Sequence, residues 1–177
     1  LFLGNDTLFH FPLVEGIQVA DVPFYILLGI AAGLFSVYFT ITFLTITKLG
    51  ARKMNPYLRI AGGGAVLGIL MFIFPPLYGE GFGFINALID GNYVSIFSGT
   101  FFSGLENQLP LMLLFLAGTV TFKAIATSVT IGAGGVGGIF APTLFMGSTL
   151  GFIVGKSLNL LGFHEVSVLN FTLVGMA

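Results

Sequence analysis

The sequence predicts an all-α integral membrane protein, a multi-helix bundle whose transmembrane helices include short and discontinuous ones. The 177 residues are 56% hydrophobic and only 7% charged, with a mean hydropathy of +1.05. Because soluble domains carry roughly 25% charged residues, so few charges could not cover a surface that faces water. Several uncharged runs come near the roughly 20 residues that cross a bilayer, and a glycine-rich stretch lies between two of them.

The first half of the chain contains two of these runs. Leu1 to Val22 is mixed in character and is predicted to be a loop. Pro23 to Thr47 has 25 uncharged residues, which as a helix would be about 37 Å long and could cross the bilayer with some tilt. Ile60 to Phe74 is an apolar run of only 15 residues, closed by two prolines. We therefore expect a long helix followed by a short one.

The second half is predicted to hold one short helix and three further spanning segments. Between Leu77 and Gln108 the regular element expected is a short helix over Gly83 to Asp90. Leu109 to Thr130 opens with a proline, which suits a first helical turn. The remaining expected elements are a helix of 17 residues over Ile139 to Gly155, a turn over Gly162 to Ser167, and the start of a further helix over Val168 to Ala177.

Charge placement predicts the orientation of this bundle. Four of the six basic residues lie in the stretch that joins the first two helices: Lys48, Arg52, Lys53 and Arg59. With the crossings numbered as above, all seven acidic residues fall in loops on the opposite side. The positive-inside rule makes the basic connection cytoplasmic. A net charge of −1 argues against a nucleic-acid partner, and the lack of cysteine in the sequence excludes disulfides.

The stretch around which the sequence is organised is Ile131 to Pro142. Five glycines within seven residues oppose a regular helix, since each costs roughly 1 kcal/mol relative to alanine. Inside a membrane such a break is tolerated only where it is buried in protein or lines a wet cavity. Pro142 suits the first turn of a new helix, so we expect that helix to begin near Ile139 to Ala141. The break is expected at the midplane or on its cytoplasmic side.

This break predicts an anion-binding site made by main-chain atoms. The first amides of a helix have no internal acceptor, and the positive end of the helix dipole lies beside them. We expect the N–H groups of Ile139 and Phe140 to bind the anion. Pore-lining or supporting residues are expected at Gly137, Gly138, Ala141, Pro142 and Lys123.

Lys123 lies inside a predicted spanning helix, where a cation costs on the order of 3 kcal/mol. It is therefore expected to face protein, water or a group of carbonyl oxygens. One interpretation is that its charge draws anions toward the inner mouth of a pore. The other is structural, with the ammonium bonding helix-end carbonyls or reaching toward the membrane surface. The sequence leaves both interpretations open.

Other polar residues have weaker functional interpretations. Glu80 and Asp90 could carry protons, but as loop carboxylates beside glycines they are expected to be solvated. The two histidines, His10 and His164, stand alone, so no metal site is predicted. Three hydroxyl residues before the break could line a pathway or could bond back to helix carbonyls, the second being expected for at least two of them: Thr127, Ser128 and Thr130.

Glycines recur at intervals of four residues in several of the predicted helices. The sets are Gly29 and Gly33, Gly64 and Gly68, and Gly147, Gly151 and Gly155. Such faces let helices approach closely in lipid, where packing rather than the hydrophobic effect drives association. We therefore interpret them as packing surfaces and not as pore residues.

The stretch Gly137 to Pro142, reading Gly-Gly-Ile-Phe-Ala-Pro, resembles the Gly-x-Phe-x-Pro signature of the CLC family of chloride channels and proton-coupled chloride antiporters. Thr143 to Gly147 and Leu173 to Ala177 look like the continuation of that helix and the opening of the next one in the family. The resemblance covers essentially the whole chain and is specific around residues 127 to 147. It implies that the amides of Ile139 and Phe140 hold chloride in the central site.

The resemblance also implies that residues 1 to 177 are part of a CLC-type transmembrane domain, cut inside the domain at both ends. They would run from the end of the family's helix I to the start of its helix O. The stretches that carry the family's hydroxyl ligand, gating glutamate and pore tyrosine do not occur in this sequence. The full-length protein would be a homodimer with one pore per subunit.

We therefore expect a protein with no enzymatic activity and no cofactor, which moves chloride or similar monovalent anions as a voltage-gated channel or an H+/Cl− antiporter. Its partners would be those anions and the lipid bilayer, and its location the plasma membrane. Two other functions stay open. One is a structural or scaffold domain whose glycines only pack helices, and the other is a cation-coupled organic anion transporter that uses the break for a substrate carboxylate.

Overall fold

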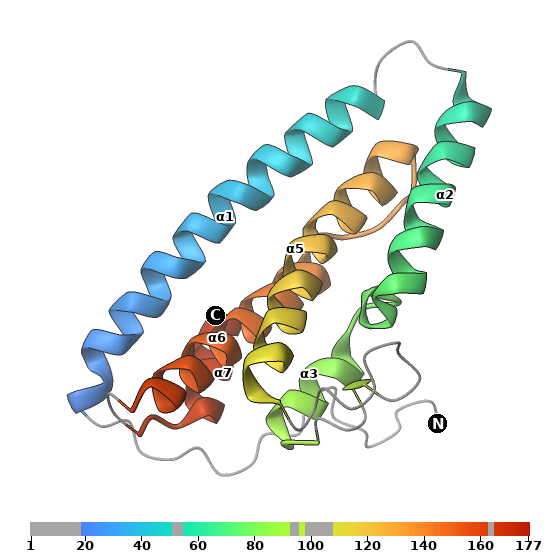
Figure 1. The fold of residues 1–177 in the computed structure, drawn as a ribbon. Helices are drawn as coiled ribbons and strands as arrows, with labels where there is room; N and C mark the ends of the chain where they lie inside the picture. The colour runs from blue at the N-terminus through green and yellow to red at the C-terminus, as the bar shows by residue number, and fades with distance from the viewer. Residues whose placement is uncertain (1–18, 51–54, 93–95, 98–107, 163–164) are drawn as a thin grey trace, which may run out of the picture.

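The computed structural model describes residues 19–50, 55–92, 96–97, 108–162 and 165–177 (Figure 1). The elements in order are η1 (Val19–Asp21), α1 (Val22–Gly50), α2 (Pro56–Ile73), η2 (Pro75–Leu77), α3 (Phe82–Ile89), α5 (Leu109–Ala133), α6 (Phe140–Leu161) and α7 (Val168–Met176). Every regular element in these residues is a helix, which confirms the predicted all-α class. Helices α1, α2, α5 and α6 are long and apolar enough to cross a membrane.

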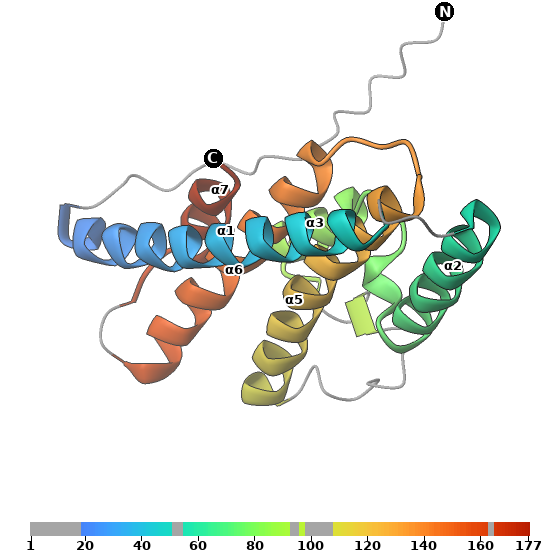
Figure 2. The same ribbon diagram turned by 90° about the horizontal axis from the view of Figure 1, so that it is seen from above.

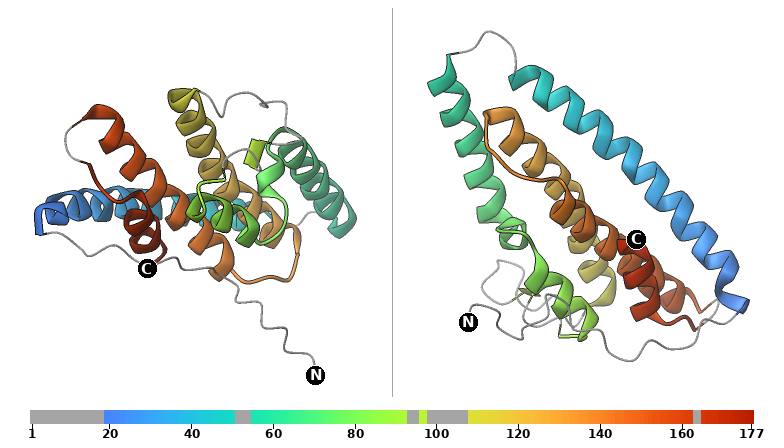
Figure 3. Two further views of the ribbon diagram at one scale, coloured as in Figure 1. Left: turned by 90° about the horizontal axis from the view of Figure 1, so that it is seen from below. Right: turned by 180° about the vertical axis from the view of Figure 1, so that it is seen from behind.

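Helix α5 lies between α1 and α2 and packs along both (Figures 1 and 3). Helix α6 begins part-way along α5 and packs most extensively against α7. Seen from above, α2 and α7 lie on opposite sides of α5 (Figure 2). One end of this bundle holds the end of α1, the start of α2 and the end of α5. We call it the basic end, because Lys48 and Arg59 lie there.

Local sequence signals set several helix ends. Asn55 caps α2, since its side-chain oxygen accepts a hydrogen bond from the amide of Tyr57 at 3.1 Å, and Pro56 takes the first helical position. Helix α2 therefore begins before the predicted Ile60 and has 18 residues instead of 15. Helix α3 confirms the short helix predicted near Gly83 to Asp90.

Helix α6 is longer than predicted. It has 22 residues and ends at Leu161, with Gly162 as its C-cap, whereas the sequence predicts 17 residues ending at Gly155. Gly155 does not end the helix, because it packs against Val168 and Phe171 of α7, where the lack of a side chain permits close contact. The helix is therefore about 33 Å long, and the prediction of a short helix here is wrong.

Three groups of buried residues hold the bundle together. The first includes Phe115 of α5 and Phe152 of α6. The second is built around Phe145 of α6, which is fully buried against α5 and α3. The third joins Leu28 of α1 to Phe171 of α7 at the end of the bundle opposite the basic end. All three involve α6 or its partner α7, so the helix that follows the break is firmly seated in the core.

The glycine triplet of α6 is a packing surface, as predicted. A Cβ atom built on Gly151 would overlap the carbonyl oxygen of Phe171, and one built on Gly147 would overlap that of Gly175. The backbones of α6 and α7 are therefore in direct contact. The other two glycine pairs, Gly29 with Gly33 and Gly64 with Gly68, face open space as far as the described residues extend.

Replacing Gly151 by alanine is expected to lower the stability of the full-length protein by about 1–3 kcal/mol, because the added methyl group forces α6 and α7 apart. Gly68→Ala in α2 is the matched control. Its methyl group meets no other described residue, and alanine favours the helix by about 1 kcal/mol. Thermal unfolding in detergent measures both variants. Equal melting temperatures for the two would contradict the importance of this contact.

Candidate anion site

The helix break is narrower than the sequence predicts. Residues 131 to 133 continue α5, so Gly132 is helical, and the chain is non-helical only from Gly134 to Ile139. Gly134 has a φ of 103°, and its amide donates to the carbonyl of Ile131 at 3.0 Å. The amide of Gly135 donates to the carbonyl of Thr130 at 2.9 Å. These bonds close the end of α5, and Gly132 stays helical because its bare Cα lets α1 approach closely.

Helix α6 begins at the predicted place. Ile139 is its N-cap, with φ −88° and ψ −8°, and no side chain caps the helix. The first backbone hydrogen bond of the helix runs from the amide of Thr143 to the carbonyl of Ile139 at 3.0 Å. Within the described residues, no acceptor is found for the amides of Ile139, Phe140 and Ala141. The helix start therefore presents open N–H donors, which is the geometry that the anion hypothesis requires.

The two sides of this helix start have different surroundings. The side chain of Phe140 is 72% exposed and that of Ile139 is 46% exposed. On the inner side, a cavity of about 170 Å³ lies between α2, α5 and the break. Its lining includes Gly137 and Gly138 from the break, Pro142 from the first turn of α6 and Lys123 from α5. The structure thus brings four of the predicted site residues to one cavity, while Ile139, Phe140 and Ala141 lie next to it in the chain.

Lys123 is 3% exposed and bonds to main-chain carbonyls. Its ammonium donates to the carbonyl of Leu77 at 3.0 Å and to that of Gly79 at 2.8 Å, and it lies 4.9 Å from the centre of the Phe145 ring. The bonds to the two carbonyls are those that the structural interpretation of Lys123 expects. Lys123 also lines the cavity beside the break. The electrostatic interpretation remains a prediction.

The hydroxyl groups before the break bond back to their own helix. Thr127 donates to the carbonyl of Lys123 at 2.9 Å, and Ser128 donates to that of Ala124 at 2.7 Å. Thr130 donates to that of Ala126 at 2.9 Å. The sequence predicts such bonds to helix carbonyls for at least two of these three residues, and all three make them. A hydroxyl whose proton is already donated offers only lone pairs, which do not attract an anion.

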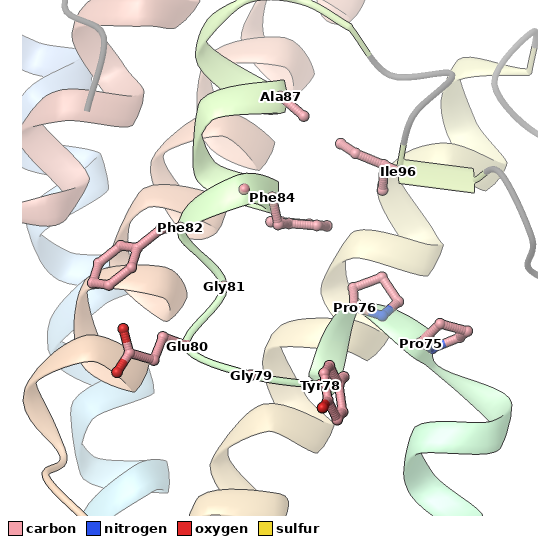
Figure 4. A pocket seen from close by; sticks show the side chains of 11 residues that line it. Pro75, Pro76, Tyr78, Gly79, Glu80, Gly81, Phe82, Phe84, Ala87 and Ile96 are labelled. Atoms are coloured by element: carbon pink, nitrogen blue, oxygen red, sulfur yellow. The ribbon is translucent and has the colours of Figure 1, made fainter. Parts of the chain in front are cut away.

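Glu80 lies on the linker between η2 and α3, at the edge of a second cavity of about 600 Å³ (Figure 4). Its side chain is exposed, as is that of Asp90 at the end of α3, which agrees with solvated carboxylates. The prediction that all seven acids lie on the side opposite the basic connection stays a prediction. Lys123 ties this linker to the middle of α5 through Leu77 and Gly79, while the side chain of Glu80 itself is exposed.

Sequence reasoning missed the carbonyl groups of Leu77 and Gly79, because a main-chain acceptor leaves no compositional signal. Gly79 lines both cavities, so the linker from Leu77 to Gly81 forms a partition between them. No group of three His, Cys, Asp or Glu side chains that could hold a metal occurs in the described residues. His10 and His164 lie outside those residues.

The family model described as voltage gated chloride channel matches residues 1–177. Two proteins named voltage-gated ClC-type chloride channel ClcB, from Escherichia coli O9:H4 (strain HS) and Shigella boydii serotype 18 (strain CDC 3083-94 / BS512), are 27% identical over 159 residues. These alignments cover 89% of this chain and 34% of each relative. ClcB of Escherichia coli O81 (strain ED1a) is 28% identical over 177 residues, or 98% of this chain and 38% of that relative.

No solved structure matches the chain. The chain spans about a third of the length of the curated relatives it matches. Their names describe channels and not enzymes. Because the family model matches every residue, including the break and the helix that follows it, the chain belongs to the CLC family of voltage gated chloride channels.

Proposed function

We propose that the full-length protein moves chloride or a similar monovalent anion across a membrane, and that the start of α6 supplies half of the binding site. The observation that carries this proposal is the set of three consecutive amides, at Ile139, Phe140 and Ala141, without an acceptor in the described residues. The relatives' names, which describe chloride channels, support the same ion.

The binding would need no covalent chemistry. Amide dipoles and the positive end of α6 replace part of the ion's hydration shell, and the partial charges hold it weakly enough to let it leave. In this proposal Lys123 adds a full positive charge at the inner side of the break. Its ammonium is hydrogen-bonded to two carbonyls, so it makes the electrostatic potential beside the break more positive without binding the ion directly.

The membrane arrangement follows from the charges at the basic end. Lys48 and Arg59 lie there, so we propose that this end is cytoplasmic. We also propose that the protein resides in the plasma membrane. We further propose that the full-length protein is a homodimer. It would work either as a voltage-gated channel or as an H+/Cl− antiporter, and each subunit would complete its own site with segments beyond these 177 residues.

Calorimetry on the full-length protein in detergent tests the proposal. We expect saturable heat on titration with potassium chloride or bromide, and none with potassium acetate beyond dilution. An organic anion transporter would instead give saturable heat with potassium acetate and none with the two halides, because its site binds a carboxylate. A scaffold domain predicts no saturable heat with any of the three salts. Either of those two results would overturn the proposed function.

A further inference from the structure

The guanidinium of Arg59, in the first turn of α2, joins the ends of two other helices. Its Nη1 donates to the carbonyl of Gly50, the last residue of α1, at 3.1 Å. Its Nε donates to the carbonyl of Ala133, the last residue of α5, at 3.2 Å. The two acceptors lie 9 and 74 residues away in sequence. One half-buried side chain thus holds together three helices at the basic end.

Electrostatics explains why a cation belongs at this point. The last carbonyls of a helix have no internal donor, and the negative ends of the dipoles lie there. The ends of α1 and α5 meet backbone to backbone, since a Cβ atom on Gly50 would overlap the carbonyl of Gly132. Two negative helix ends in contact repel each other. A planar guanidinium that donates to both offsets that repulsion and fixes their separation.

Arg59 also lies against the first residue of the break. A Cβ atom built on Gly134 would lie 2.9 Å from its Nη2 atom, so the guanidinium packs directly on this glycine. The six residues from Gly134 to Ile139 are all that joins the end of α5 to the start of α6. Four of the six are glycines, which restrict the backbone least of all residues. The geometry of the segment therefore depends on how its two ends are held.

We propose that Arg59 is a positioning residue for the anion site. By fixing the end of α5, it fixes where the break begins and hence how the amides of Ile139 and Phe140 are presented. The inference rests on the proposed function for its effect on the anion. Its structural part, the anchoring of the break, depends on the contacts of Arg59 with Gly50, Ala133 and Gly134 and can be measured separately.

The experiment compares three variants of the full-length protein in detergent. Arg59→Gln removes the charged guanidinium that donates to both carbonyls, and Arg59→Lys keeps the charge without the planar geometry. Lys48→Gln is the matched control, because it removes the same charge from an exposed side chain in the last turn of α1. Calorimetry with potassium bromide gives the halide affinity. Hydrogen exchange of the Gly134 and Gly135 amides, which donate to the carbonyls of Ile131 and Thr130, reports on the anchoring of the break. This measurement needs no bromide.

We expect Arg59→Gln to weaken bromide binding about tenfold and to accelerate exchange in the break about tenfold, since a bond to a charged donor contributes that much. Lys48→Gln should change each by less than about twofold. Arg59→Lys should fall between them, and it carries the comparison if Arg59→Gln does not fold. Equal values for the Arg59 variants and Lys48→Gln would overturn the positioning role. If the wild-type protein binds no halide, the proposed function fails, while exchange alone still decides whether Arg59 anchors the break.

Discussion

Replacing Ile139 by proline in the full-length protein is expected to weaken chloride binding at least about tenfold. The substitution removes one amide donor from the helix start, and a hydrogen bond to an ion is worth about 1.5–3 kcal/mol. The fold should tolerate the ring. The φ of Ile139 is −88°, close to the proline value, and its amide takes no part in α6, whose first bond uses only its carbonyl. Gly138 before it has the freedom that a residue preceding proline needs.

The matched control is Ile139→Val, which keeps the amide and changes only the exposed side chain. Calorimetry with chloride on both variants, together with thermal unfolding, separates a lost ligand from a lost fold. We expect the valine variant to bind like the wild-type protein. If the proline variant also keeps its affinity while remaining folded, the amide of Ile139 is not a ligand and the site must lie elsewhere.

The position of the break could be predicted because its signals are local. Clustered glycines oppose a helix wherever they occur, and Pro142 fits only an early helical position, so the start of α6 at Phe140 follows from adjacent residues. The end of α6 could not be predicted in the same way. Gly155 and Gly134 are both glycines near a helix end, but Gly155 packs against α7 and stays helical, whereas Gly134 adopts a positive φ and ends α5. Tertiary contacts decide between the two outcomes.

The hydrogen-bond partners of Lys123 and Arg59 could not be predicted from the sequence, for another reason. Lys123 was expected to need carbonyl oxygens, protein or water, but the acceptors are main-chain groups of Leu77 and Gly79, 46 and 44 residues away. In the sequence, Arg59 is informative only as one of the charges that orient the bundle. Its acceptors belong to the ends of other helices. A carbonyl exists at every position, so only the fold determines which carbonyls converge on a cation.

Lys123→Met is expected to destabilise the full-length protein by about 2 kcal/mol or more. Methionine has a similar length but no donor, so the buried carbonyl of Leu77 and the partly exposed carbonyl of Gly79 both lose their partner. Each buried acceptor left unpaired costs about 1–3 kcal/mol, and relief from burying the ammonium offsets part of that sum. The linker from Leu77 to Gly81 should loosen as a result, and with it the partition between the two cavities. Thermal unfolding in detergent measures the loss.

Lys48→Met serves as the control, because an exposed lysine at the basic end changes stability by less than about 0.5 kcal/mol when replaced. Chloride flux through both variants in vesicles then separates the two roles of Lys123. A fall in stability with unchanged flux per folded molecule would leave only the carbonyl-bonding role and remove the electrostatic one. A fall in flux for Lys123→Met but not for Lys48→Met would instead show that a positive charge acts on the anion from beside the break.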